Sequence, residues 1–174
     1  MNGYDKAFQT GRFLFERNCF LKDYNFAETG GNFLPASVFI DRYCFSYNIN
    51  QRIILTTLQR ECSLISIKNY AEAKENKNDA GLPIMDWVCC VGVPDSLKVN
   101  EKYKGFEKQI AGACAIYRHW YNLYEEGKIK ELVKPDKELL CIPENEITFS
   151  LLMYTPHIEA LHLTEKIYYS FFNA

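Results

Sequence analysis

The carboxylate of Glu61 is the side chain whose position most needs a chemical explanation. It lies in the stretch "LQRECSLI", residues 58–65. Read as a helix at about 100° per residue, this stretch places Glu61 beside Ile54 and Leu58 on an apolar face. The neighbouring Arg60 points elsewhere on the helix, so we do not expect it to be the partner of Glu61. An ionised carboxylate without a partner is costly there, so Glu61 must pair, hold a proton or face a cleft.

Two chemical roles fit a carboxylate in that position. The first is a salt bridge to an arginine that is distant in the sequence. The second is a general acid that keeps its proton near neutral pH because an apolar wall disfavours the charged form, as glycoside hydrolysis requires. Helical periodicity alone leaves both roles open.

The cysteines and histidines add little further chemistry. The chain has seven cysteines, an odd number, and most lie in apolar stretches, which is typical of reduced core residues. Only Cys89 and Cys90 are close in sequence, and adjacent cysteines suit tetrahedral zinc poorly. His157 has no acidic residue nearby to orient it, and Cys62 has no adjacent cation to activate a thiolate. We therefore expect no metal ion and no cofactor.

Length and charge indicate one soluble globular domain covering residues 1–174. The chain is 48% hydrophobic with a formal net charge of -2, and its Lys and Arg are scattered among Asp and Glu. This argues against a nucleic-acid partner. No apolar run approaches the roughly 20 residues needed to cross a bilayer. The start "MNGYDKAFQTGRF" lacks the order of a secretory signal. We expect no membrane span and no signal peptide, with synthesis in the cytoplasm.

Breaker residues predict the helix that carries Glu61. Pro35 can open a helix that runs to about Tyr47, and Asn50 then caps a second helix. Within this second helix, polar residues such as Thr56 and Gln59 gather opposite the apolar face. The pattern therefore predicts a pair of consecutive helices, with Glu61 on the apolar face of the second, which is read as helical through Ile65.

The second half of the chain is predicted to be helical as well. Apolar residues recur at helical spacing over residues 105–127, where Gly127 ends the helix, and a last helix is expected over residues 158–172. Between them, "KELLCIPEN" at residues 137–145 could form one arm of a small hairpin. The predicted fold class is mainly α, with a small β hairpin.

The stretch from Leu34 to Ser66, "LPASVFIDRYCFSYNINQRIILTTLQRECSLIS", resembles a catalytic segment of peptidoglycan hydrolases. The group is the bacterial and phage lysozyme-like, lytic-transglycosylase-like family, in which an "INP"-like helix start leads into Leu-Gln-x-Glu-x-Ser-Leu. Three further blocks follow in the order of the family: "MDWVCCVGVPDS" (85–96), "YKGFEKQIAGA" (103–113) and "ITFSLLMYTPHI" (147–158). The resemblance leaves residues 1–33 outside it.

The resemblance implies a lysozyme-like helical domain whose substrate and partner is a peptidoglycan glycan strand. It implies that Glu61 is the catalytic acid/base for the β-1,4 bond between N-acetylmuramic acid and N-acetylglucosamine. It further implies that Gln109 and Tyr154 line the sugar cleft and that the turn at Asp95 shapes it. Thr155 stands beside Tyr154 before a proline that forces extended backbone, which would present a hydroxyl to a sugar.

Alternatives stay open for several of these residues. Gln109 lies at the edge of the apolar face of its helix, where its amide could reach a cleft or a buried carbonyl. Tyr154 could instead be a buried residue with one hydrogen bond. After the bond is cleaved, Asp86 or Asp95 could activate water or act as a nucleophile. The sugar's own 6-hydroxyl could attack instead, giving a 1,6-anhydro product without a second carboxylate.

The sequence also departs from the family pattern. Gln51 replaces a usual helix-opening proline, Cys62 replaces a usual glutamine, and "VCCVG" at residues 88–92 replaces small residues that would let backbone amides approach a sugar. An alternative function is therefore a catalytically weak or inactive lysozyme-like binding or structural module of a virion or cell surface. A third is a different enzyme that uses Cys62 or His157. An active hydrolase would reach the cell wall after release or as part of a virion or cell-wall-associated assembly.

Overall fold

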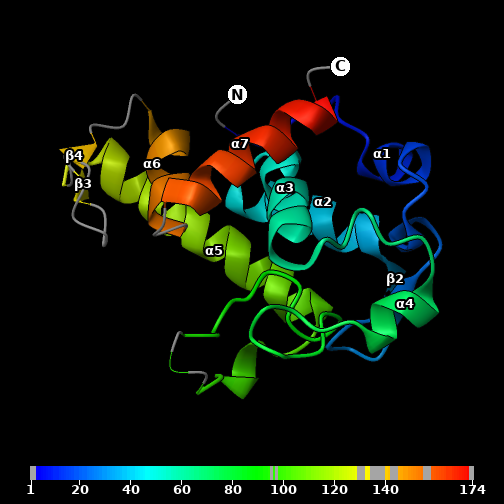
Figure 1. Cartoon of the computed structure of the whole chain (residues 1–174). Coiled ribbons are helices and arrows are strands. Elements are labelled where there is room, and N and C mark those ends of the chain that lie inside the picture. The colour runs from blue at the N-terminus through cyan, green and yellow to red at the C-terminus, as the bar shows by residue number, and fades with distance from the viewer. Residues whose placement is uncertain are drawn as a thin grey trace.

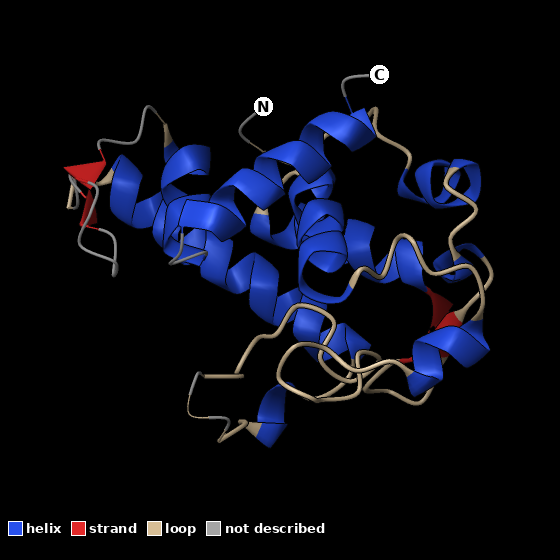
Figure 2. Ribbon diagram, viewed as in Figure 1, coloured by secondary structure: helices blue, strands red, loops and turns tan. Residues whose placement is uncertain are grey.

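Helices dominate the architecture (Figures 1 and 2). The computed structural model describes residues 3–94, 96, 98–128, 132–133, 140–141, 145–154 and 158–172. The α-helices in this part of the chain are α1 (Thr10–Glu16), α2 (Ala36–Tyr47), α3 (Gln51–Cys62), α4 (Tyr70–Glu75), α5 (Phe106–Glu125), α6 (Glu146–Tyr154) and α7 (Ile158–Phe172). Short 3₁₀ turns lie at Phe20–Lys22 and Glu101–Tyr103. The predicted helices after Pro35, over residues 105–127 and over residues 158–172 are confirmed.

The described strands form two short antiparallel pairs at opposite ends of the molecule (Figure 2). β1 (Asn25–Ala27) pairs with β2 (Phe33–Pro35), and β3 (Leu132–Val133) pairs with β4 (Leu140–Cys141). β4 lies within the segment predicted to be a hairpin arm. The prediction of a mainly α fold with a small hairpin is therefore confirmed.

Helix α3 packs against three other helices. It contacts α2, α5 and α7, and α7 crosses it in Figure 1. Asn50 caps it by accepting a hydrogen bond from the Arg52 amide at 3.0 Å, as predicted. Its polar side is also covered: Thr56 is buried, and its hydroxyl donates to the Arg52 carbonyl at 2.8 Å. Burial of this second side distinguishes α3 from an ordinary surface helix.

The N-terminal segment fixes the position of α7 over α3. The Phe13 ring packs against Phe171 with ring centroids 5.6 Å apart. Arg17 donates to the Ser170 and Phe171 carbonyls at 2.9 and 3.0 Å, which pairs two carbonyl groups in the last turn of α7. The N-terminal segment and the last helix are therefore in contact. The clustered aromatic residues of the N-terminal sequence did not indicate which segment they would pack against.

No helix within the described residues is long and apolar enough to cross a membrane. The longest is α5, which belongs to the core: Ile110, Ala113 and Tyr117 are buried along one face. Its length serves packing, because it contacts α2, α3 and α6.

Removing a buried side chain from α3 should destabilise the whole fold. Leu58 is fully buried, so Leu58→Ala should lower the free energy of unfolding by about 2–5 kcal/mol. Leu163→Ala on α7 is the matched control, because Leu163 is exposed and its loss should change stability by less than about 0.5 kcal/mol. Urea unfolding of both variants measures their free energies of unfolding. Equal losses of stability in the two variants would contradict the burial of Leu58 in the core.

Candidate functional site

Glu61 lies in the last turn of α3. The helix ends at Cys62 because Ser63 adopts a left-handed backbone conformation with φ 52°. The Ser63 amide donates to the Gln59 carbonyl at 2.9 Å, and the Leu64 amide donates to the Leu58 carbonyl at 3.2 Å. These bonds close the helix and leave the Glu61 side chain 21% exposed. The carboxylate is thus neither fully buried nor free in solvent.

Arg60 is the partner of Glu61, so the prediction that it points elsewhere is wrong. Its Nε donates to Glu61 Oε1 at 2.9 Å, and its Nη2 donates to the same oxygen. The helical wheel compares Cβ directions, but the long arginine side chain can bend back along the helix surface. Two residues that are consecutive in a helix, and so about 100° apart on the wheel, can therefore still form an ion pair.

The guanidinium of Arg60 joins three helices. The side chain is only 5% exposed. Its Nη1 donates to Thr164 Oγ1 on α7 at 3.1 Å, and the group lies over the Tyr154 ring of α6, 5.3 Å from its centroid. An arginine is always charged, and a buried charge needs such partners. The position of Glu61 Oε1 is consequently set by α6 and α7 as well as by its own helix.

The second carboxylate oxygen of Glu61 has a different environment. Both Arg60 donors converge on Oε1, and Oε2 makes no hydrogen bond with any residue that the structure describes. The Glu61 side chain as a whole is 21% exposed. Its two oxygens therefore differ in their hydrogen bonds to the described residues.

The Tyr154 ring under the Arg60 guanidinium belongs to a pair of stacked tyrosines. The rings of Tyr117 and Tyr154 lie 4.7 Å apart at an interplanar angle of 9°. Burial raises the pKa of Tyr117 to about 12 and raises the pKa of Tyr154 well above its ordinary value. Both phenols are therefore neutral near pH 7. The Tyr154 hydroxyl donates to the Cys89 carbonyl at 2.6 Å, so it anchors the loop after Trp87.

Gln109 holds the same loop from the core side. Its side chain is fully buried. The Oε1 atom accepts from the Cys89 and Val91 amides at 3.2 and 3.0 Å, and the Nε2 group donates to the Val91 and Tyr103 carbonyls at 2.9 Å each. Every hydrogen-bonding position of the amide is used on backbone. The sequence left open whether the Gln109 amide reaches a cleft or a buried carbonyl. In the structure it binds the Val91 and Tyr103 carbonyls and does not reach a cleft.

Some of the remaining candidate residues lie in described segments and others do not. Asp95, Thr155 and His157 lie outside the described residues. Asp86 is 3.6 Å from Lys104 Nζ through its Oδ2, so it takes part in an ion pair. The interaction with Cys90 and burial raise the thiol pKa of Cys62, which makes this thiol a slow nucleophile and a poor catalytic one. Within the described residues, no group of three or more His, Cys, Asp and Glu is arranged to hold a metal ion.

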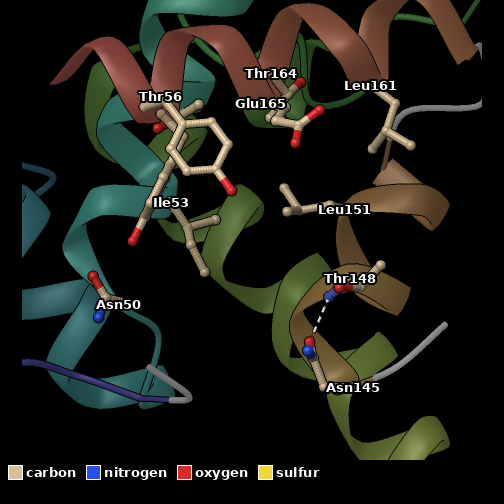
Figure 3. A pocket seen from close by; sticks show the side chains of 11 residues that line it. Asn50, Ile53, Thr56, Asn145, Thr148, Leu151, Leu161, Thr164 and Glu165 are labelled. Carbon is tan, nitrogen blue, oxygen red and sulfur yellow. Dashed lines mark hydrogen bonds between the residues drawn. The ribbon is translucent and has the colours of Figure 1, made fainter. Parts of the chain in front are cut away.

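A cavity of about 460 Å³ lies between α3, α6 and α7, beside Arg60 rather than around Glu61. Figure 3 shows side chains of the three helices turned toward it, among them Ile53, Thr56, Leu151, Leu161, Thr164 and Glu165. Thr164 both lines the cavity and accepts a hydrogen bond from Arg60. The sequence analysis missed this cavity. Its one signal was the polar side of α3, which includes Thr56.

Comparisons with known proteins give no match for this chain. No family model matches the sequence, no curated protein matches it and no solved structure matches the fold.

Replacing Gln109 should weaken the fold near Glu61. In Gln109→Leu, the Cys89 and Val91 amides lose their buried acceptor, and we expect destabilisation of more than about 2 kcal/mol. Gln59→Leu is the matched control, because its bonds to Ser66 are exposed and their loss should cost less than about 1 kcal/mol. Thermal unfolding compares the two variants. A Gln109→Leu protein as stable as its control would show that the loop does not depend on this amide.

Proposed function

We propose that this chain is a peptidoglycan-cleaving glycosidase that uses Glu61 as its general acid/base. The bond cleaved is the β-1,4 bond between N-acetylmuramic acid and N-acetylglucosamine. The single observation that carries the proposal is the unequal environment of the two Glu61 oxygens: Arg60 holds Oε1, while Oε2 is unbonded among the described residues. The ordered sequence blocks that resemble lytic-transglycosylase-like hydrolases supply the substrate class.

In the proposed first step, Oε2 carries the proton and delivers it to the glycosidic oxygen. The carbon–oxygen bond to the leaving sugar breaks, and an oxocarbenium-like centre develops on the muramoyl sugar. The carboxylate that remains on Glu61 is stabilised by Arg60, whose donors already point at Oε1. A protonated carboxyl can keep Oε1 as the acceptor for Arg60.

In the second step, the ionised Glu61 removes a proton from the incoming nucleophile. That nucleophile is water or the 6-hydroxyl of the muramoyl sugar itself, and the latter gives a 1,6-anhydro product. The path through the sugar hydroxyl needs no second carboxylate. It suits a site in which Asp86 is engaged with Lys104.

Gln109 and Tyr154 take part in this proposal as positioning residues. Both hold the backbone of residues 89–91, Gln109 through the Cys89 and Val91 amides and Tyr154 through the Cys89 carbonyl. The Tyr154 ring also lies under the guanidinium that positions Glu61. A direct sugar contact by the Tyr154 hydroxyl would require its bond to Cys89 to break.

The Arg60–Glu61 pair favours a second candidate function. An ion pair with a 5% exposed arginine explains the carboxylate without any chemistry. A lysozyme-like binding or structural module of a virion or cell surface would keep this pair and bind a glycan without cleaving it. The two functions differ in turnover, which is measurable.

Replacing Glu61 by glutamine should abolish cleavage and leave the fold intact. The amide keeps an oxygen that can accept from Arg60, but it cannot deliver a proton. We expect a modest loss of stability, about 1–2 kcal/mol, from the weaker hydrogen bond to a charged group. Zymography on purified peptidoglycan and thermal unfolding should be performed on the same sample, with mass spectrometry of the released muropeptides to identify the product.

Glu28→Gln is the matched control for this experiment. Glu28 is paired with Arg42 and its side chain is 20% exposed, nearly the same as the Glu61 side chain. This variant should retain cleavage. A wild-type chain that binds peptidoglycan without cleaving it would support the module. Cleavage by Glu61→Gln at the wild-type rate, or loss of activity only through unfolding, would remove Glu61 as the acid.

A further inference from the structure

Two thiols from different elements converge on one backbone carbonyl beside Glu61. Cys62 ends α3, and its Sγ donates to the Trp87 carbonyl at 3.5 Å. Cys90 lies in the loop that follows Trp87, and its Sγ donates to the same oxygen at 3.7 Å. The interaction with the Cys90 side chain is also the largest cause that raises the thiol pKa of Cys62. The two sulfur atoms are therefore neighbours, although the residues are distant in sequence.

The loop holds Cys90 in a constrained position. Its backbone has φ 54°, in the left-handed region that residues other than glycine rarely adopt. The Asn78 side-chain amide donates to Cys90 Sγ at 3.4 Å. Among the cysteines whose surroundings the structure describes, Cys90 alone is partly exposed and the others are buried. An oxidant arriving from solvent can therefore reach Cys90 before Cys62.

We propose that Cys62 and Cys90 form a redox-active dithiol that hydrogen peroxide converts reversibly into a disulfide. In the first step, the Cys90 sulfur attacks one peroxide oxygen, the O–O bond breaks, and the departing hydroxide takes the thiol proton as water. Cys90 is left as a sulfenic acid. In the second step, the Cys62 sulfur attacks the Cys90 sulfur, the S–O bond breaks, and the departing hydroxide leaves with the Cys62 proton as a second water. Two thiols are oxidised and one peroxide is reduced to two waters.

The disulfide would tie the end of α3 to the loop that Gln109 and Tyr154 hold. Cys62 directly follows Glu61, so the link would fix the spacing between that carboxylate and the loop. Cys62 is the slower partner, because its interaction with Cys90 and its burial raise its thiol pKa. The second step should therefore be faster at higher pH, where more of the Cys62 thiol is ionised.

Peptide mapping of the folded chain tests this assignment. Reduced protein is treated with hydrogen peroxide, then denatured, alkylated, digested and analysed by mass spectrometry. We expect a linked peptide pair containing Cys62 and Cys90, with loss of alkylation at these two thiols and its full recovery after treatment with dithiothreitol. Wild-type protein without this link, in which Cys90 instead proceeds to sulfinic acid, would overturn the proposal.

Cys44 and Cys114 provide an internal control. The Cys114 side chain helps to raise the thiol pKa of Cys44, as Cys90 does for Cys62, but Cys44 and Cys114 are both fully buried. Both thiols should still be alkylated after peroxide treatment. A Cys44–Cys114 disulfide that forms as fast as the Cys62–Cys90 disulfide would show that exposure of Cys90 to the oxidant does not determine which pair reacts. In Cys62→Ser, Cys90 should over-oxidise because it lacks the resolving thiol. Equal over-oxidation in the wild type would show that Cys62 does not resolve it, and the wild-type map decides the question if this variant fails to fold.

Discussion

The buried positive charge of Arg60 constrains the region around the end of α3. A guanidinium that is 5% exposed and cannot lose its proton must be surrounded by partners. Glu61 supplies a carboxylate oxygen, Thr164 supplies a hydroxyl from α7, and Tyr154 supplies a ring face from α6. Thr164 can reach Arg60 only if α7 is correctly positioned. Arg17 helps to hold α7 through hydrogen bonds to carbonyls in its last turn. The position of Glu61 therefore depends in part on a contact made by the N-terminal segment, through α7 and Arg60.

The boundaries of the main helices could be predicted from the sequence because their signals are local. Asn50 accepts a hydrogen bond from the first turn of α3, and α2 begins directly after Pro35. The short elements could not be predicted in this way. β1 has only three residues, and its Phe26 stacks on Phe106 of α5 with ring centroids 3.8 Å apart. Phe26 and Phe106 are distant in sequence, so their contact leaves no local sequence pattern. The sequence therefore did not indicate that residues 25–27 would form a strand.

The candidate site was predictable to the same extent. Periodicity placed Glu61 on the apolar face of a helix, which depends only on local geometry, but it continued that helix through Ile65, whereas α3 ends at Cys62. It missed the pair with Arg60 because a helical wheel treats a long side chain as a direction. It left Gln109 with two options because the choice is made by another segment: the Cys89 and Val91 amides are buried and need an acceptor. Side chains whose partners lie elsewhere in the chain are resolved only by the fold.

The manner in which Arg60 binds Glu61 is what makes an ion pair compatible with acid–base chemistry. An arginine and a carboxylate gain most when two donors meet two oxygens in parallel. Here two donors meet Oε1 alone, so the pair forgoes that second bond although both partners are adjacent in the chain. A pair that served stability alone would be expected to use both oxygens. An acid needs one oxygen fixed, so that the carboxyl group has a defined orientation, and the other oxygen open to the atom that receives the proton. Among the described residues, Glu61 has Oε1 bonded to Arg60 and Oε2 without a hydrogen bond, so the ion pair does not by itself assign the residue to structure.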